Sequence, residues 1–127
     1  MLREALDLDA PARVAWRLLI DTHEWPRWGP SVRAVDSPQR LIGPGVRGRV
    51  QSAPGLWLPF VITDWEADRG WAWRVGGVPA TGHRIEALAA DRCRVSFLIP
   101  AWAPFYRPVC RAALARIAER LRQRPIA

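Results

Sequence analysis

Three segments in the second half of the chain alternate with a period of two. In residues 71–75, 83–87 and 93–99, one set of alternate positions is apolar or aromatic and the other is rich in Arg. This is the period of a β-strand with one buried and one wet face. Turn residues separate the segments, at 76–77 and 90–91. The sequence therefore predicts an antiparallel sheet whose apolar face must be covered by another element.

Four more segments are predicted strands, namely 2–8, 32–37, 46–50 and 56–65. Pro59 within the last of them favours an edge position or a bulge, because proline cannot donate a ladder hydrogen bond. The phase of that strand is ambiguous, so Asp64 could lie on either face.

Helical signals occur at both ends of the chain. Asp9 is a good N-cap for a helix that ends near Ile20, and a second short helix or turn follows over 23–28. Near the C-terminus, two prolines place the start of a long helix at Phe105 or Tyr106, and Pro125 ends it. Its apolar stripe consists of Tyr106, Cys110, Ala113, Leu114, Ile117 and Leu121.

These elements predict one α+β domain over residues 1–127. Only the final helix is long enough to cover the apolar face, so we expect a curved antiparallel seven-stranded sheet wrapped around it. Two short helices after the first strand would close one end. No apolar run approaches the ~20 residues that a membrane span needs, and no apolar leader follows Met1, so we expect a cytoplasmic protein.

The 19 basic residues are all Arg, and the net charge is +7. A genome rich in G and C would explain this bias without any function, whereas an anionic partner would explain it functionally. The Arg residues are spread along the chain, with one dense cluster at 116–124. A nucleic-acid partner is therefore disfavoured, and an Arg-rich interaction module for an acidic partner stays an alternative.

Cys93 and Cys110 are the only cysteines. They have no zinc-type spacing and no nearby pair of histidines, so we expect two buried thiols, no disulfide and no metal site. No motif for a cofactor is present.

Several motifs are similar to those of one known superfamily. DAPA (9–12), VAWRLLID (14–21) and WPRWGPSV (25–32) resemble the opening of START-like or SRPBCC proteins, which include polyketide cyclases/dehydrases and lipid-transport proteins. ITDW (62–65) and residues 70–74 and 82–86 look like that family's central strands. The resemblance spans about residues 1–124 and implies a helix-grip fold with a cavity between the sheet and the long helix.

The inner sheet face and the helix stripe together predict an apolar pocket for a small hydrophobic or aromatic molecule. The residues expected to line it are Trp71, Trp73, His83, Ile85, Phe97, Ile99, Tyr106, Cys110, Ala113 and Ile117. The resemblance adds Trp28, because that region borders the cavity mouth in family members. These large side chains could leave an open cavity or fill the space themselves.

His83 lies on the predicted inner face and allows three roles. It could act with Tyr106 as the acid or base of a polyketide cyclase or dehydratase, which is the enzyme alternative. It could instead fix a ligand carbonyl or hydroxyl, or bond a carboxylate such as Asp64.

Residues 57–60 combine Trp, Leu, Pro and Phe. If they are exposed, they form an apolar patch suited to a homodimer or to a lipid surface.

Overall fold

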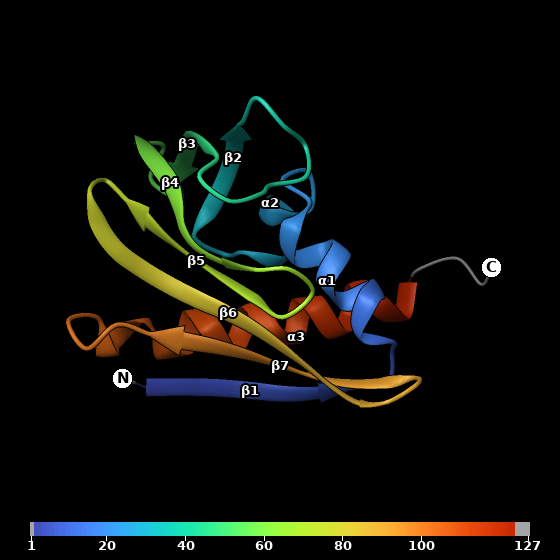
Figure 1. Cartoon of the computed structure of the whole chain (residues 1–127). Helices are drawn as coiled ribbons and strands as arrows, with labels where there is room; N and C mark the ends of the chain where they lie inside the picture. Colours follow the sequence, from blue (N-terminus) through green and yellow to red (C-terminus); the bar gives the residue numbers. More distant parts are fainter. Residues whose placement is uncertain (1, 124–127) are drawn as a thin grey trace.

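One antiparallel sheet of seven strands curves around the C-terminal helix in the computed structural model, which describes residues 2–123 (Figure 1). The strand order is β1-β7-β6-β5-β4-β3-β2. The elements are β1 (Leu2–Leu8), α1 (Ala12–Ile20), α2 (Trp25–Trp28), β2 (Val32–Asp36), β3 (Arg47–Ser52), β4 (Trp57–Glu66), β5 (Gly70–Val75), β6 (Val78–Ala89), β7 (Arg92–Ile99), η1 (Pro104–Tyr106) and α3 (Arg107–Gln123). The predicted α+β helix-grip architecture is confirmed.

The sheet is a meander from β2 to β7, and β1 joins its open edge beside β7. The first two helices form the connection between β1 and β2, and both pack against α3. None of the helices within residues 2–123 is long and apolar enough to span a membrane.

The helix starts are set by prolines. α1 begins after Pro11, whose carbonyl accepts hydrogen bonds from the amides of Val14 and Ala15. The prediction of Asp9 as N-cap is therefore wrong, because the extended backbone of Pro11 already provides the helix entry. The long helix α3 follows the 3₁₀ turn η1 and begins at Arg107, one or two residues after the expected start at Phe105 or Tyr106. The expected stop at Pro125 lies outside the described residues.

The alternate apolar positions of the predicted strands face the interior, as predicted. Cys93, Val95, Phe97 and Ile99 on β7 are at most 2% exposed, and His83 on β6 is 2% exposed. Ala87 departs from this pattern and is exposed, because it lies toward the β6–β7 turn, beyond the buried part of β6.

Two bulges change which residues face inward. Between β5 and β6 the register passes from Ala72↔Gly82 to Arg74↔Pro79, so Trp73 lies opposite two residues of β6, 80 and 81. A bulge adds a residue on one strand and redirects the neighbouring side chains. Here it places both residues of β6 beside the interior.

The second bulge is in β4, where Ile62 and Asp64 pair with neighbouring residues of β5. Asp64 is exposed as a result. Pro59 is neither at an edge nor at this bulge: it lies in an interior strand, one residue beyond the last ladder pair with β5, Phe60↔Val75. A proline at the margin of the ladder removes little hydrogen bonding.

Candidate ligand-binding site

Two adjacent hollows lie between the sheet and the segment from the end of β7 to α3. The larger, here called the mouth cavity, has a volume of about 340 Å³. It is lined by Ser31, Val32, Val50, Ser52, Leu58, Trp73, Val75, Val78, Ala80, Thr81, Pro100, Trp102, Ala103 and Tyr106. The smaller, here called the inner void, measures about 40 Å³ and shares Ser31, Val32, Trp73, Thr81 and Tyr106 with it.

Stacked rings fill most of the space around the inner void. The ring of Trp71 lies between those of Trp25 and His83, with centroids 5.4 Å and 4.0 Å away and interplanar angles of 18° and 29°. Phe97 meets His83 edge-on at 4.9 Å. Offset and edge-to-face contacts of this kind are favourable beyond the area that they bury. The interior is therefore nearly closed at this end of the sheet.

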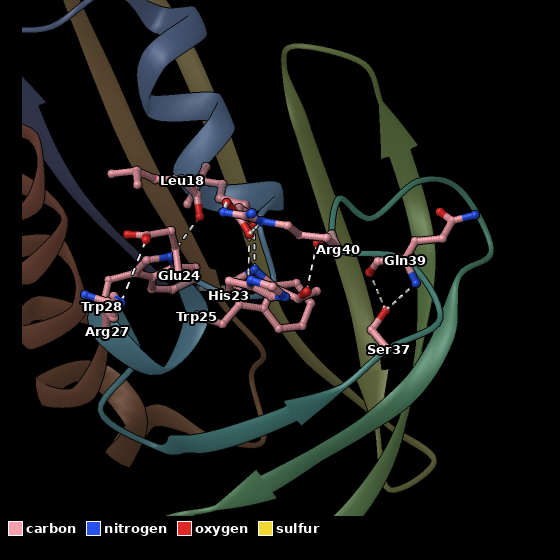
Figure 2. Close-up of polar contacts among 12 residues, drawn as sticks. Leu18, His23, Glu24, Trp25, Arg27, Trp28, Ser37, Gln39 and Arg40 are labelled. Atoms are coloured by element: carbon pink, nitrogen blue, oxygen red, sulfur yellow. Dashed lines mark hydrogen bonds and ion pairs between the residues drawn. The ribbon is translucent and has the colours of Figure 1, made fainter. Parts of the chain in front are cut away.

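The tryptophans of α2 are fixed by hydrogen bonds to α1 (Figure 2). The indole Nε1 of Trp25 donates to the carbonyl of Leu19 over 2.9 Å, and that of Trp28 donates to the carbonyl of Leu18 over 2.9 Å. Both carbonyls belong to the last turn of α1, where backbone acceptors lack helical partners. These two hydrogen bonds thus satisfy carbonyl groups at the end of α1 and orient both indole rings toward the sheet.

A buried carboxylate secures the chain between α1 and α2. Arg40 donates to both oxygens of Asp21 over 3.0 Å, and the backbone amide of His23 donates to one of them over 3.0 Å. Burial alone would raise the pKa of Asp21, but these donors together lower the pKa below its usual value. Asp21 is therefore ionised and holds the loop that contains Arg40 against the end of α1.

His83 bonds to a neighbour on its own strand. Its Nε2 lies 3.1 Å from the hydroxyl of Thr81, which also accepts a hydrogen bond from Trp73 Nε1 over 3.3 Å. Asp64 is exposed, so the hypothesis that a carboxylate such as Asp64 partners His83 is wrong. The β4 bulge is the physical reason, since Asp64 follows it onto the outer face.

Burial lowers the pKa of His83 to about 3, and this effect outweighs the opposing influence of the Trp71 backbone. Its Nδ1 makes no hydrogen bond of normal geometry within residues 2–123, and the same holds for Trp71 Nε1. The imidazole is therefore neutral at physiological pH.

Tyr106 lies between the two hollows and shares a hydrogen bond with the hydroxyl of Ser31. Burial raises the pKa of its phenol, which stays protonated at neutral pH. The two cysteines are free and buried, as predicted, and burial raises the pKa of Cys110 to about 11. No group of three or more potential metal ligands occurs in the part of the chain that the structure describes.

The residues predicted to line the pocket divide into three sets. Trp73 and Tyr106 border the mouth cavity, while Trp28, Trp71, His83, Phe97, Cys110 and Ala113 border the inner void. Ile85, Ile99 and Ile117 line neither hollow and pack in the core. Contact of any of them with a ligand stays a prediction.

Most of the mouth cavity was missed by sequence reasoning. Val50 and Val75 carry a signal, because both continue apolar rows of predicted strands. Ala80 and Thr81 carry none, since a bulge brings them to the interior. Trp102 lies in a loop, where no period assigns a face.

Comparisons with known proteins place this geometry in a family. The family model described as polyketide cyclase / dehydrase and lipid transport matches residues 2–124. No curated protein matches the sequence.

Several solved structures share the fold at low identity. The di-domain ARO/CYC protein BexL from the BE-7585A biosynthetic pathway aligns with a TM-score of 0.71 and 20% identity over 95% of this chain and 46% of BexL, so this chain spans about half of it. The protein XoxI from Bacillus cereus gives a TM-score of 0.73 at 8% identity, covering 96% of this chain and 95% of its own. A conserved protein of unknown function from Enterococcus faecalis gives 0.69 at 13% identity, covering 98% of this chain and 72% of its own.

The match over nearly the whole chain confirms the predicted resemblance to START-like proteins. By that match, the chain belongs to the polyketide cyclase / dehydrase and lipid transport family.

Proposed function

We propose that this protein binds a small, largely apolar molecule in the mouth cavity. The observation that carries the proposal is the cavity itself, whose volume of about 340 Å³ lies at the low end of the ~300–1,000 Å³ usual for ligand sites. Its walls are mainly aliphatic and aromatic, and the polar side-chain groups of its lining residues are four hydroxyls and two indole N–H groups. Such a site selects for shape and apolar surface, with one or two hydrogen bonds to set orientation.

The titratable groups favour binding over acid–base catalysis. Among the residues that line the mouth cavity, Tyr106 is the single titratable side chain, and its pKa is raised. Of the two hollows, His83 borders the inner void and not the mouth cavity, and a base with a pKa of about 3 accepts protons poorly at neutral pH. The cyclase or dehydratase alternative, with His83 and Tyr106 as proton carriers, therefore has weaker support than a binding role.

Titration with N-phenyl-1-naphthylamine, an uncharged fluorescent aromatic probe, tests the proposal. We expect enhanced fluorescence and a rise in melting temperature on binding, because a ligand that binds the folded state alone stabilises it. Ala80→Trp places an indole in the cavity and should weaken probe binding by at least about tenfold.

Ala72→Trp is the matched control. It makes the same substitution on the adjacent strand, at a half-buried position outside the mouth cavity. Val75→Phe is a second, smaller obstruction in case Ala80→Trp does not fold. Unchanged affinity in folded Ala80→Trp and Val75→Phe, or equal loss in Ala72→Trp, would contradict the proposal.

A further inference from the structure

Exposed apolar side chains gather around the mouth cavity. Within residues 2–123, seven large hydrophobic residues are exposed, and five of them lie on or beside three connections at one end of the sheet: Leu56, Trp57, Val78, Trp102 and Phe105. Scattered single exposures are ordinary, but a contiguous group marks an interaction site. We call these five residues the apolar rim.

The topology explains why they meet. In an antiparallel meander, the β3–β4, β5–β6 and β7–η1 connections all fall at the same end, at the left of Figure 1. Val78 and Trp102 line the mouth cavity directly. Trp102 Nε1 donates to the carbonyl of Pro79 over 2.9 Å, which ties two of the connections together. The rim therefore lies at the same end of the sheet as the mouth cavity, and two of its five residues line that cavity.

The side chains of the apolar rim are not buried by packing against the rest of the protein. Phe105 is 70% exposed, Leu56 is 61% exposed and Trp102 is 55% exposed. Phe60, which the sequence grouped with Trp57 in one patch, is buried instead and contacts Trp25. The predicted patch at residues 57–60 is thus corrected to a rim assembled from three separate loops.

The unpaired charge beside the apolar rim is positive. No Asp or Glu occurs in segments 50–58, 75–81 or 99–106, which carry the rim. Two exposed arginines lie beside them: Arg74 donates to the carbonyl of Gly77 over 3.2 Å, and the guanidinium of Arg33 lies close to Gly55. Neither pairs with a carboxylate within residues 2–123.

Most carboxylates of the sheet lie toward its opposite end, and the two that do not, Glu4 and Asp36, form ion pairs with arginines. Asp64, Glu66, Asp68, Glu86 and Asp91 lie in or next to the β4–β5 and β6–β7 turns. The protein therefore presents an apolar end with unpaired positive charge and a far end with mixed charge.

We propose that the apolar rim docks on the surface of an anionic lipid bilayer, with the mouth cavity facing the membrane. Trp and other apolar side chains at loop tips favour the bilayer interface, and nearby arginines are attracted to acidic headgroups. A second copy of the chain is the poorer occupant, since it would bring like-charged rims together on a protein of net charge +7. A docked cavity could exchange an apolar ligand without exposing it to water.

Sedimentation with vesicles tests this proposal without knowledge of the ligand. The full chain should bind vesicles of phosphatidylcholine with phosphatidylglycerol, and should bind pure phosphatidylcholine far less. Leu56→Ala combined with Phe105→Ala should weaken binding by at least about tenfold, since affinity scales with the inserted apolar area. Arg33→Gln combined with Arg74→Gln should weaken it by at least about fivefold and flatten its salt dependence.

Leu88→Ala is the matched control, because Leu88 is an exposed hydrophobic residue at the opposite end of the sheet. It should bind vesicles like the unmodified chain. Absence of binding to anionic vesicles, or equal binding by the Leu56/Phe105 variant with its fold verified by circular dichroism, would overturn the proposal. Concentration-dependent dimers that the same variant abolishes would also overturn it, in favour of an interface between copies.

Discussion

The inner face of the sheet is closely packed at one end and hollow at the other. Near His83, the rings of Trp71, Trp25 and Phe97 pack so closely that only about 40 Å³ remains. Near Trp73, the strands instead present Val, Ala and Thr, and about 340 Å³ stays open. Side-chain size along otherwise equivalent rows thus decides which end is core and which end is cavity.

Hydrogen bonding reinforces this difference. The closed end is fixed by indole bonds to α1, which leave Trp25 and Trp28 one orientation each. At the open end, Trp102 and Phe105 contact each other edge-on with centroids 6.3 Å apart and remain largely exposed. An aromatic ring at the closed end should therefore add more to the stability of the fold than one at the open end, where the rings should instead contact a ligand or another surface.

The largest test of this comparison is Trp71→Ala. Trp71 is 3% exposed and stacked on two rings, so its removal should lower the free energy of unfolding by about 4 kcal/mol. Urea denaturation followed by circular dichroism measures the change. Trp102→Ala, the same substitution at the open end, should cost about 1 kcal/mol or less. Equal losses at the two positions would refute the division into a structural and a recognition end.

His83 extends the comparison to pH. The unfolded imidazole takes up a proton near pH 6.5, whereas the folded one does so only at about 3. Below pH 6.5 the unfolded state therefore binds more protons, and stability falls as pH falls. We expect a loss of about 2 kcal/mol between pH 6.5 and about pH 4.5, measured as the free energy of unfolding against pH.

Variants separate His83 from other titrating groups. His83→Phe should flatten this slope, while His23→Gln, at the exposed second histidine, should keep it. Glu4, Asp7, Asp21 and Glu119 have pKa values that are lowered in the folded state. The stability that they contribute is lost only as pH falls below their unfolded values of 4.5 or 3.8, which lie at or below the acid end of this pH range. A slope that persists in His83→Phe would show that another group causes it.

The closed end could be predicted from the sequence more completely than the open end. Alternation assigns a face to Trp71, His83 and Phe97, and all three are buried. It cannot assign a face to Ala80 or Thr81, because a bulge shifts the register by one residue and the alternation of apolar residues in the sequence does not reveal that shift. Nor could it decide how much space remains, since that depends on which rings stack and how their indoles are held.

Thr81 marks the boundary between the two ends. Its hydroxyl bonds both Trp73 Nε1 and His83 Nε2 in a buried setting. Thr81→Val keeps the shape but leaves both nitrogens without this partner, so we expect a loss of about 2 kcal/mol in unfolding free energy. Thr63→Val, at an exposed position on β4, should change it by less than about 0.5 kcal/mol. A neutral Thr81→Val would mean that water replaces the hydroxyl.

The smallest expected effect concerns Tyr106, which borders both hollows. Its hydroxyl already shares a hydrogen bond with Ser31, so a ligand gains less from it than from an unpaired hydroxyl. Tyr106→Phe should therefore change the affinity for N-phenyl-1-naphthylamine by less than about threefold, a difference well under ~1 kcal/mol. Fluorescence titration of Tyr106→Phe and of Ser31→Ala, which breaks the same bond from the other side, measures it. If Tyr106→Phe alone lost affinity by tenfold or more, the phenol would contact the ligand. The open end would then hold a proton donor at the bound molecule, and the cyclase alternative would gain the support that His83, with its low pKa, does not give it.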